Sequence, residues 1–424
     1  MKARNKKSWQ GPLVKMMTGA RCASAELPLL PAGLKKRVLL AVATALRKAE
    51  KHLIAENQKD VRRARHERLS AAMVDRLTLT PARIREMAEG VRVVANLKDT
   101  IGQVLARWHR PNGLRISKVV VPIGVILIIY ESRPNVTVEC ASLCFKSGNA
   151  AILRGGREAY HSNRALVALF EKVFKRFRLP AAMVNLVPTS DYAALDFLLG
   201  REAEINLVIP RGGEALIRKV VELSRIPVIK HYKGICHVYV DRKADLRKAL
   251  AIAYNAKLQR PGVCNAMETL LVHRKIAAKF LPVLGKHLER GGCEIRGDRM
   301  TLKYIPSAKR AKPDDYGHEF LDKILAVKVV SDVLEAVGHI QRFSSAHTDA
   351  IVTEDRLAAE IFKARVDSSS VMVNASTRFS DGFQYGFGAE IGISTDKIHA
   401  RGPMGLDGLT SYKYLVEGDG QVRT

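Results

Sequence analysis

Three short apolar runs, separated by helical patterns, most strongly limit what this chain can fold into. Each run is continuous rather than alternating, which is typical of strands buried on both faces of a parallel sheet. The runs cover residues 123–130, 150–153 and 205–209. Helical periodicity fills the intervals, over residues 137–146, 162–177 and 190–199. This order of strand and helix predicts a doubly wound α/β sheet.

The part of the chain before this sheet is expected to be mainly helical. Apolar residues recur at helical spacing from Leu34 to Asn57, and Thr80-Pro81 is typical of a helix N-terminus. Residues 1–25 carry six Lys or Arg and no acid, which fits either a transit-like leader or a basic tail with a first helix. We favour the tail and helix, because no small-residue cleavage pattern follows a clear apolar core.

A second α/β block is expected after residue 236. Its predicted strands are residues 237–241, 269–272, 324–330 and 350–352. A highly basic loop is predicted between them, at residues 299–312.

Two further β segments show some alternation of polar and apolar residues, at Leu114–Val121 and Thr410–Val416. The second alternates throughout, and the first does so only at its start. Such segments suit an edge strand or a strand that pairs with a partner's sheet.

Composition excludes several classes of protein. No run of about 18 apolar residues exists, so a membrane span is not expected. The six cysteines form no CxxC pair and no disulfide framework, which favours a reduced, cytoplasmic protein without a bound metal. The formal net charge of +28 is the anomaly, because it is what a nucleic-acid-binding protein shows. The excess is spread along the chain and only 6% of residues are aromatic, so we expect a basic surface and no specific nucleic-acid partner.

One cysteine stands where a nucleophile would be placed. Cys264 lies between Pro261-Gly262, a turn signal, and the apolar run Thr269–Val272. A turn at the edge of a core lets a thiol meet solvent and substrate while packed structure positions it. From these residues alone, a small buried hydrophobic side chain is the other interpretation, and it describes most free cysteines.

Two glycine pairs follow predicted strands directly, in Arg154-Gly155-Gly156 and Arg211-Gly212-Gly213. The second pair opens a predicted helix at residues 214–221. Backbone amides at a helix N-terminus, next to an arginine, suit a pyrophosphate or a 2′-phosphate. Neither pair matches GxGxxG, so a simple turn is the alternative.

Taken together, these residues resemble the γ-glutamyl phosphate reductases, a branch of the aldehyde dehydrogenase superfamily, from about Ala20 to the C-terminus. Long matching motifs follow one another in the family's order. They are Val121-Pro-Ile-Gly-Val125, Tyr130-Glu-Ser-Arg-Pro-Asn-Val-Thr137, Lys146-Ser-Gly-Asn149, Ile152-Leu-Arg-Gly-Gly156, Ile209-Pro-Arg-Gly-Gly213, Gly234-Ile-Cys-His-Val-Tyr-Val-Asp241, Gln259-Arg-Pro-Gly-Val-Cys264-Asn-Ala-Met-Glu268, Val373-Asn-Ala-Ser-Thr-Arg378 and Gly388-Ala-Glu-Ile-Gly-Ile-Ser394.

The resemblance implies an aldehyde dehydrogenase-like α/β fold. A Rossmann-like cofactor domain would span residues 1–236, with an arm strand within about 106–124. A catalytic domain would span residues 237–372. Residues 373–424 would return to the cofactor domain and end in an oligomerisation strand, which implies a homo-oligomer.

The resemblance also assigns roles to residues. Cys264 would be the nucleophile, and Asn135 would donate to the oxyanion together with the backbone N–H of Cys264. Arg154 would contact the adenosine ribose, and Glu319 the nicotinamide ribose. Arg157 departs from the family, where a small residue is commoner, and it would either strengthen 2′-phosphate binding or simply be exposed.

The implied reaction is reduction of L-glutamyl 5-phosphate by NADPH to L-glutamate 5-semialdehyde and phosphate, through a thioester on the cysteine. The segment Lys230–Gly234 carries no acid where oxidising relatives in the superfamily keep a general-base glutamate. Without a base, water attacks a thioester poorly. That argues against the first alternative, an oxidising dehydrogenase with another substrate. The second alternative is a basic nucleic-acid-binding protein on a degenerate scaffold, which the intact motifs oppose.

The residues that bind the substrate are less clearly defined by the sequence. We expect Ser376, Thr377 and Arg378 to form part of the cradle for the α-carboxylate, with Arg133 as the next candidate. A loop that only connects two domains is the alternative for residues 376–378. Hand-over of the acyl phosphate from glutamate 5-kinase is a further expectation.

Overall fold

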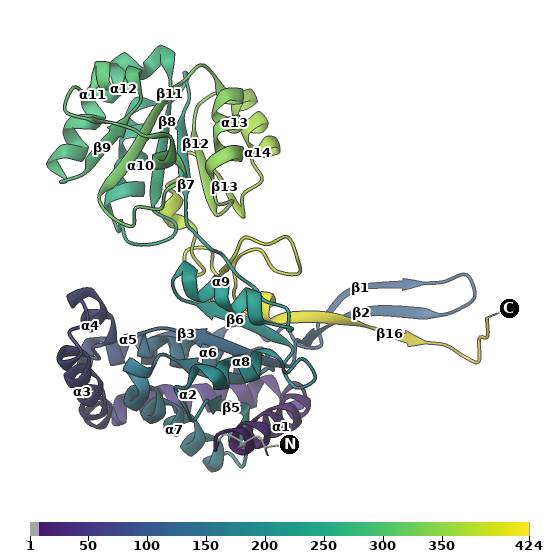
Figure 1. The fold of residues 1–424 in the computed structure, drawn as a ribbon. Coiled ribbons are helices and arrows are strands. Elements are labelled where there is room, and N and C mark those ends of the chain that lie inside the picture. The colour runs from purple at the N-terminus through teal and green to yellow at the C-terminus, as the bar shows by residue number, and fades with distance from the viewer. Residues whose placement is uncertain (1–7, 424) are drawn as a thin grey trace, which may run out of the picture. The chain divides into compact units, whose positions relative to one another are not determined.

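The computed structural model describes residues 8–423, which divide into two compact units (Figure 1). Within the described residues, unit 1 comprises residues 8–230, 386–392 and 404–423. Unit 2 comprises His231–Tyr385 and Ile393–Pro403. The basic N-terminal segment falls partly outside the described residues, because residues 1–7 are not among them. Helix α1 (Gln10–Glu26) covers most of the remainder.

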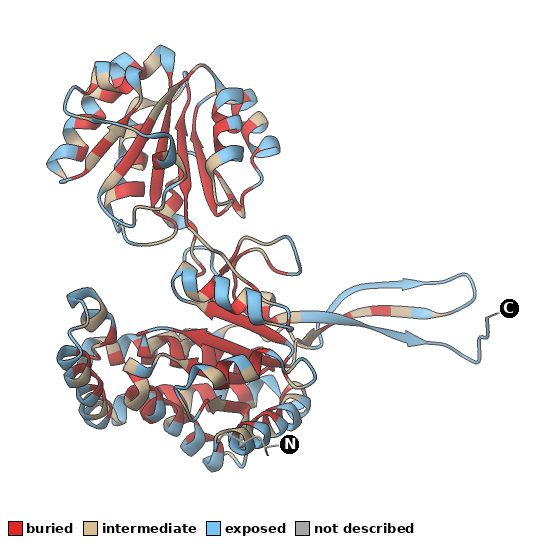
Figure 2. Cartoon of the chain, viewed as in Figure 1, coloured by how far each residue is buried: buried red, intermediate tan, exposed pale blue. Residues whose placement is uncertain are grey.

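Unit 1 is built on a four-stranded parallel sheet in the order β5-β4-β3-β6. Its strands are β3 (Val125–Tyr130), β4 (Ala150–Gly155), β5 (Val184–Leu186) and β6 (Leu207–Arg211). Every residue of β3 is buried (Figure 2), as a continuous apolar run at the centre of a sheet requires. The structure therefore confirms the α/β sheet predicted from the three apolar runs.

Helices account for most of the rest of unit 1. They are α1, α2 (Ala32–Lys48), α3 (Glu50–His66), α4 (Ala71–Leu77), α5 (Pro81–Asn96), α6 (Pro134–Lys146), α7 (Tyr160–Arg176), α8 (Tyr192–Leu199) and α9 (Glu214–Leu223). Thr80 caps α5 as predicted, since its hydroxyl accepts a hydrogen bond from the backbone N–H of Arg83. The helical region predicted from Leu34 to Asn57 is two helices, which meet at Ala49.

A separate three-stranded antiparallel sheet, the arm, extends away from the rest of unit 1 (Figure 1). Its strands are β1 (Val104–His109), β2 (Arg115–Pro122) and β16 (Thr410–Glu417). The register runs from Thr410 opposite Pro122 to Glu417 opposite Arg115, so the two predicted β segments pair with each other within the chain. Strand β1 was not expected as a separate element, and all its residues are exposed.

Unit 2 contains a seven-stranded parallel sheet in the order β10-β9-β11-β8-β7-β12-β13. The strands are β7 (Cys236–Val240), β8 (Met267–His273), β9 (Glu294–Gly297), β10 (Lys309–Arg310), β11 (Ile324–Val330), β12 (Thr348–Val352) and β13 (Ser370–Val373). A short antiparallel pair, β14 (Ile393–Ser394) and β15 (Gly402–Pro403), completes the unit. The predicted basic loop was wrong as a loop, because helix α12 (Arg299–Tyr304) and β10 lie within it.

Two hydrophobic clusters lie on opposite faces of the unit 2 sheet. On β8, Leu270 and Val272 belong to one cluster and Leu271 to the other, since successive side chains of a strand point to opposite faces. Helices α10 (Leu246–Leu258) and α11 (Arg274–Arg290) cover the first face. Helices α13 (Val333–Phe343) and α14 (Arg356–Arg365) cover the second, which makes the sheet doubly wound.

The division into units differs from the sequence-based domain boundaries at both joins. Unit 2 begins at His231 rather than at 237, and it retains residues 373–385. Those residues stay with unit 2 because the turn at Thr377 bonds to the loop that follows α10, as described below. Within residues 8–423, no helix is long and apolar enough to cross a membrane.

Candidate active site

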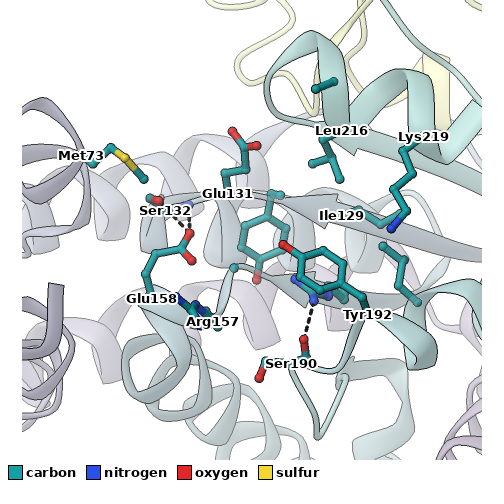
Figure 3. A pocket seen from close by; sticks show the side chains of 15 residues that line it. Met73, Ile129, Glu131, Ser132, Arg157, Glu158, Ser190, Tyr192, Leu216 and Lys219 are labelled. Carbon is teal, nitrogen blue, oxygen red and sulfur yellow. Dashed lines mark hydrogen bonds between the residues drawn. The ribbon is translucent and has the colours of Figure 1, made fainter. Parts of the chain in front are cut away.

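A pocket of about 450 Å³ lies at the carboxyl ends of strands β3 and β4 in unit 1 (Figure 3). Three cationic side chains, two carboxylates and a tyrosine ring contribute to its walls. The residues concerned are Arg154, Arg157, Lys219, Glu131, Glu158 and Tyr192. Pockets of this size hold small ligands and cofactors, and open α/β sheets bind nucleotides at this end.

Arg154, which was predicted from the sequence to bind the cofactor, is buried and lines this pocket. Its guanidinium donates to the backbone carbonyls of Gly155 (3.1 Å) and Ser190 (2.9 Å). Burial lowers the pKa of Arg154 from its usual value, and the neighbouring Tyr192 and Glu158 oppose this shift. Its Nε atom is buried without a hydrogen-bond partner among the described residues. A donor in that position suits a polar ligand atom, because buried polar atoms are rarely left unpaired.

The ring of Tyr192, at the start of α8, is flanked by two cations. The Arg154 guanidinium lies 5.3 Å from the ring centroid, and Lys219 Nζ lies 5.1 Å from it. Figure 3 shows Tyr192 and Lys219 on facing walls of the pocket. Neither residue was predicted from the sequence. Lys219 lies in the predicted helix that follows the predicted strand at 205–209, whereas the strand before Tyr192, β5, was itself not predicted.

The two predicted glycine pairs are used differently. Gly156 lines the pocket, and Gly155 closes β4 beside Arg154. Arg211, Gly212 and Gly213 do not line it. The backbone N–H of Gly213, which precedes α9, instead donates to the Glu131 carboxylate (3.2 Å). An acid of the chain thus holds the helix N-terminus that was predicted for a phosphate, as an anion at that position is expected to do.

Arg157 begins a 3-10 turn, Arg157–Ala159, at the mouth of this pocket. Its side chain is largely exposed and lies 3.2 Å from Glu67. On the inner wall, Glu158 accepts from the backbone N–H (2.8 Å) and the hydroxyl (2.7 Å) of Ser132. Figure 3 shows the contact between Glu158 and Ser132, which joins the loop after β4 to the end of β3.

Asn135 and Arg133 lie at the start of α6 in unit 1. Pro134 is the first helical residue and Arg133 the N-cap, and the Arg133 side chain is exposed. Asn135 is half-buried, and its amide donates to Glu139 one turn later (2.9 Å). Asn135 is therefore held on a helix, which gives its amide a defined direction.

Cys264 lies in unit 2, in the turn between the end of α10 and the start of β8. It is half-buried, whereas four of the other cysteines are buried and Cys22 is exposed on α1. Cys264 is therefore a partly exposed residue in a turn, which is the position predicted from Pro261-Gly262.

Loops that enter neighbouring strands meet around this turn. Glu319, in the segment before β11, accepts from the backbone N–H of Gly234 (2.8 Å), which lies just before β7. A fully buried ion pair joins α10 to β8, with Lys257 Nζ 2.6 Å from Glu268 Oε2. Burial raises the pKa of Glu268 to about 7, against the opposing effect of Lys257.

The segment Ser376–Arg378 is brought to the residue that follows Cys264. The Thr377 hydroxyl donates to the backbone carbonyl of Asn265 (2.7 Å), and the Arg378 guanidinium donates to the Asn265 side chain and to Gln259 Oε1 (2.8 Å). The Ser376 hydroxyl accepts from the backbone N–H of Arg378 (3.3 Å). Ser376 and Thr377 therefore hold the loop, and Arg378 lies beside the Cys264 turn. Burial lowers the pKa of Arg378, and Arg260 adds to this effect.

The predicted site residues thus form two groups. Asn135, Arg133, Arg154 and both glycine pairs belong to unit 1. Cys264, Glu319 and Ser376–Arg378 belong to unit 2, where the last three are packed against the Cys264 turn.

Comparison with known proteins places the whole chain in one group. The sequence profile described as "Aldehyde dehydrogenase family" matches residues 10–295. The γ-glutamyl phosphate reductase of Carboxydothermus hydrogenoformans is 53% identical over 404 residues, which cover 95% of this chain and 97% of that protein. The γ-glutamyl phosphate reductase of Desulfatibacillum aliphaticivorans is 51% identical over 412 residues, which cover 97% of this chain and 99% of that protein.

Solved structures agree with this grouping. The crystal structure of γ-glutamyl phosphate reductase from Thermotoga maritima superposes with a TM-score of 0.95 at 44% sequence identity, covering 97% of this chain and all of that one. An acetylating aldehyde dehydrogenase from Geobacillus thermoglucosidasius gives a TM-score of 0.67 at 16% identity, covering 98% of each chain. The second likeness concerns the fold alone.

Proposed function

The chain belongs to the aldehyde dehydrogenase family, in its γ-glutamyl phosphate reductase branch, and on that premise we propose that it reduces L-glutamyl 5-phosphate to L-glutamate 5-semialdehyde with NADPH, the second step of proline biosynthesis. The observation that carries the proposal is the Cys264 turn, which is half-buried and contacted by the loop that enters β7 and by the segment after β13. The loop that enters β7 is in turn bonded to Glu319 before β11. The relatives' shared name supplies the substrate.

In this proposal the Cys264 thiolate attacks the acyl carbon of the substrate and expels phosphate, which leaves a γ-glutamyl thioester on the sulfur. The tetrahedral oxyanion formed on the way would accept from the backbone N–H of Cys264 and from the Asn135 amide. One such donor is worth about 3 kcal/mol of barrier in enzymes where it has been removed. Arg378, next to the turn, is our candidate for the substrate's carboxylate or phosphate, since a guanidinium binds either with two parallel hydrogen bonds.

The residues that line the unit 1 pocket support binding of a dinucleotide that carries an additional phosphate. Arg154, with its unpaired buried Nε, would bind the ribose, and the Tyr192 ring offers a flat surface for a base. Arg157 and Lys219 add positive charge to the walls, which supports NADPH over NADH. In unit 2, Glu319 would hold the nicotinamide ribose. When bound, the cofactor supplies the hydride that reduces the thioester.

The segment Lys230–Gly234 supports reduction rather than oxidation. It contains two lysines, a histidine, a tyrosine and a glycine, and none of these is a carboxylate that could act as a base. A thioester needs an activated water to be hydrolysed, so it would survive here until the hydride arrives.

The arm supports a homo-oligomer. Strands β1 and β16 are almost wholly exposed, and Trp108, Tyr412 and Tyr414 form an aromatic group on them, with Trp108 and Tyr414 6.0 Å apart. A second copy of the chain would cover these edges. Light scattering of the wild-type chain, and of a variant truncated before β16, tests this. Substrate hand-over from glutamate 5-kinase remains an expectation from the instability of acyl phosphates.

The reverse assay tests the function. Pure protein is mixed with glutamate 5-semialdehyde, phosphate and NADP⁺, and the absorbance of NADPH is followed. Formation of NADPH that requires all three reagents supports the proposal. Formation without phosphate would point to an oxidising dehydrogenase instead. No reaction with either NADP⁺ or NAD⁺, under conditions where the protein binds NADPH, would overturn it.

A further inference from the structure

Two residues of the segment that enters β7 contact the backbone of Cys264. A Cβ atom on Gly234 would overlap the carbonyl oxygen and the Cα of Cys264, so only glycine leaves room for this approach. Two residues later, the Cys236 Sγ–H donates to the same carbonyl oxygen, at 3.2 Å. The peptide that follows the nucleophile is thus in contact with a second cysteine.

The surroundings of Cys236 favour the thiol form that donates this hydrogen bond. It is fully buried, and burial raises the pKa of its thiol well above the usual value, with Asp349, Cys264 and Glu268 adding to the effect. Burial therefore favours the protonated thiol, which is the form that can donate a hydrogen bond. On its other side lies the ring of buried His347, whose Nδ1 is 3.8 Å from Cys236 Sγ and 2.8 Å from the Thr348 hydroxyl.

The residue that follows Cys264 is held as well. Asn265, the residue after Cys264, accepts from Thr377 through its carbonyl and donates through its side chain to the carbonyl of Ser380 (2.9 Å). With the Cys264 carbonyl and the Asn265 peptide both bonded, rotation of the chain between these two residues is restricted. That rotation also moves the Cys264 sulfur and its N–H, the two groups required for attack.

We propose that Cys236 is a positioning residue for Cys264, whose S–H···O=C hydrogen bond holds the nucleophile's peptide in the orientation that attack requires. This inference rests on the proposed function of Cys264. It goes beyond that function because it gives a second cysteine, which does not touch substrate, an effect on the chemical step. A role in packing alone is the competing explanation, since Cys236 is a small buried side chain.

Cys293 provides a matched control. It is also a buried cysteine of unit 2 whose pKa burial raises to about 12, and its Sγ–H also faces a backbone carbonyl, that of Glu294, at 3.7 Å. Cys236→Ala and Cys293→Ala therefore remove the same atoms from the same unit. They differ in whether the carbonyl concerned belongs to Cys264.

The experiment compares wild type, Cys236→Ala, Cys236→Ser and Cys293→Ala. Two rates are measured, alkylation of Cys264 by iodoacetamide across pH, quantified by peptide mass spectrometry, and kcat in the reverse assay. Cys236→Ala is expected to lower kcat about tenfold, the loss of one hydrogen bond in the transition state, and to change the alkylation profile, with KM for both substrates within about twofold. Cys236→Ser, which keeps a donor, should recover most of kcat, and Cys293→Ala should match wild type in both rates.

Equal effects of the two alanine variants, or no effect of Cys236→Ala on either rate, would overturn the inference and leave packing. If Cys236→Ala does not fold, Cys236→Val, which fills the space without a donor, replaces it in the same comparison. The alkylation measurement does not need turnover. A wild type without activity, whose Cys264 alkylation still responds to Cys236→Ala, would overturn the proposed function and not the positioning of Cys264.

Discussion

The two parallel sheets of this protein carry their candidate chemistry at opposite ends. In unit 1 the pocket lies where strands end, with Glu131 directly after β3 and Arg154 at the end of β4. In unit 2 the candidate residues lie where strands begin, with Cys264 before β8, Gly234 before β7 and Glu319 before β11. Two sheets of the same parallel type thus carry their candidate residues at opposite ends of their strands.

This difference has an electrostatic consequence. The carboxyl ends of the unit 1 strands lead into helix N-termini, such as that of α9, where backbone N–H groups favour anions. The Cys264 turn instead follows the C-terminal end of α10, which presents carbonyl groups. Apart from the oxyanion that the Cys264 N–H would bind, anions at the unit 2 site therefore depend on side chains, and Arg378 and Arg260 are two cations near it. The proposed roles follow this division, with phosphates of the cofactor in unit 1 and chemistry on a thiol in unit 2.

Replacing the Cys264 thiol should distinguish the proposed roles of the two units most clearly. Cys264→Ser is expected to lower reverse-assay turnover more than about a thousandfold, because a hydroxyl without a base is a far weaker nucleophile. NADPH binding, followed by fluorescence, should be unchanged, since the unit 1 pocket is untouched. The four cysteines other than Cys264 and Cys236 serve as controls, and their alanine variants should keep close to wild-type activity. Activity of Cys264→Ser within tenfold of wild type would remove Cys264 from the mechanism.

Asn135 tests whether a unit 1 residue acts on unit 2 chemistry. Asn135→Ala should lower kcat about a hundredfold, as loss of one oxyanion donor does elsewhere, and leave cofactor affinity within about threefold. Glu139→Gln is a useful control, because it keeps a partner for the Asn135 amide on the same helix. A change confined to KM would return Asn135 to a role in the helix start alone.

The sequence predicted the elements whose patterns depend on burial, and missed contacts that join distant segments. Strands β3, β4 and β6 were found because burial on both faces demands continuous apolar runs. Strand β1 was missed because all its residues are exposed and it carries neither a continuous apolar run nor the sustained alternation that marked the equally exposed strand β16. The place of Cys264 in a turn was predicted from Pro261-Gly262, a local signal. The contacts of Gly213 with Glu131, and of Cys236 with Cys264, were not, because nothing in either segment alone identifies its partner.

Arg154 tests the unit 1 end of the comparison. Arg154→Ala should raise the Kd for NADPH about thirtyfold, since hydrogen bonds from charged groups contribute about 1.5–3 kcal/mol. Cys264 alkylation by iodoacetamide should keep its wild-type rate. The side chain also bonds to Ser190, so the melting temperature is recorded as a control for the loop. Arg154→Lys keeps the charge and should recover part of the affinity; an unchanged Kd in both variants would mean that the pocket holds something else.

Arg378 tests the claim that side chains bind anions in unit 2. Arg378→Ala should raise KM for glutamate 5-semialdehyde about tenfold in the reverse assay, with KM for NADP⁺ within about twofold. Because the guanidinium also bonds to Gln259, Gln259→Ala is the control for loss of that contact alone. An unchanged aldehyde KM would shift the search to Arg133 in unit 1, and the proposed division of roles would then be wrong for the substrate.

The smallest expected effect is on the free energy of unfolding at low pH, and it concerns a histidine of unit 2. His339, on α13 in the core of unit 2, packs against Tyr316 and Phe343, and burial lowers its pKa to about 3. In the unfolded chain this histidine binds a proton near pH 6.5. The free energy of unfolding that the buried neutral ring contributes is therefore complete above that pH and is lost progressively as the pH falls towards 3. For this one residue the loss is about 1 kcal/mol at pH 6 relative to pH 8. Urea unfolding of wild type and His339→Phe at both pH values measures it: the variant's free energy of unfolding should fall less by that amount. Equal slopes for wild type and His339→Phe would mean that this histidine is not held neutral by the unit 2 core.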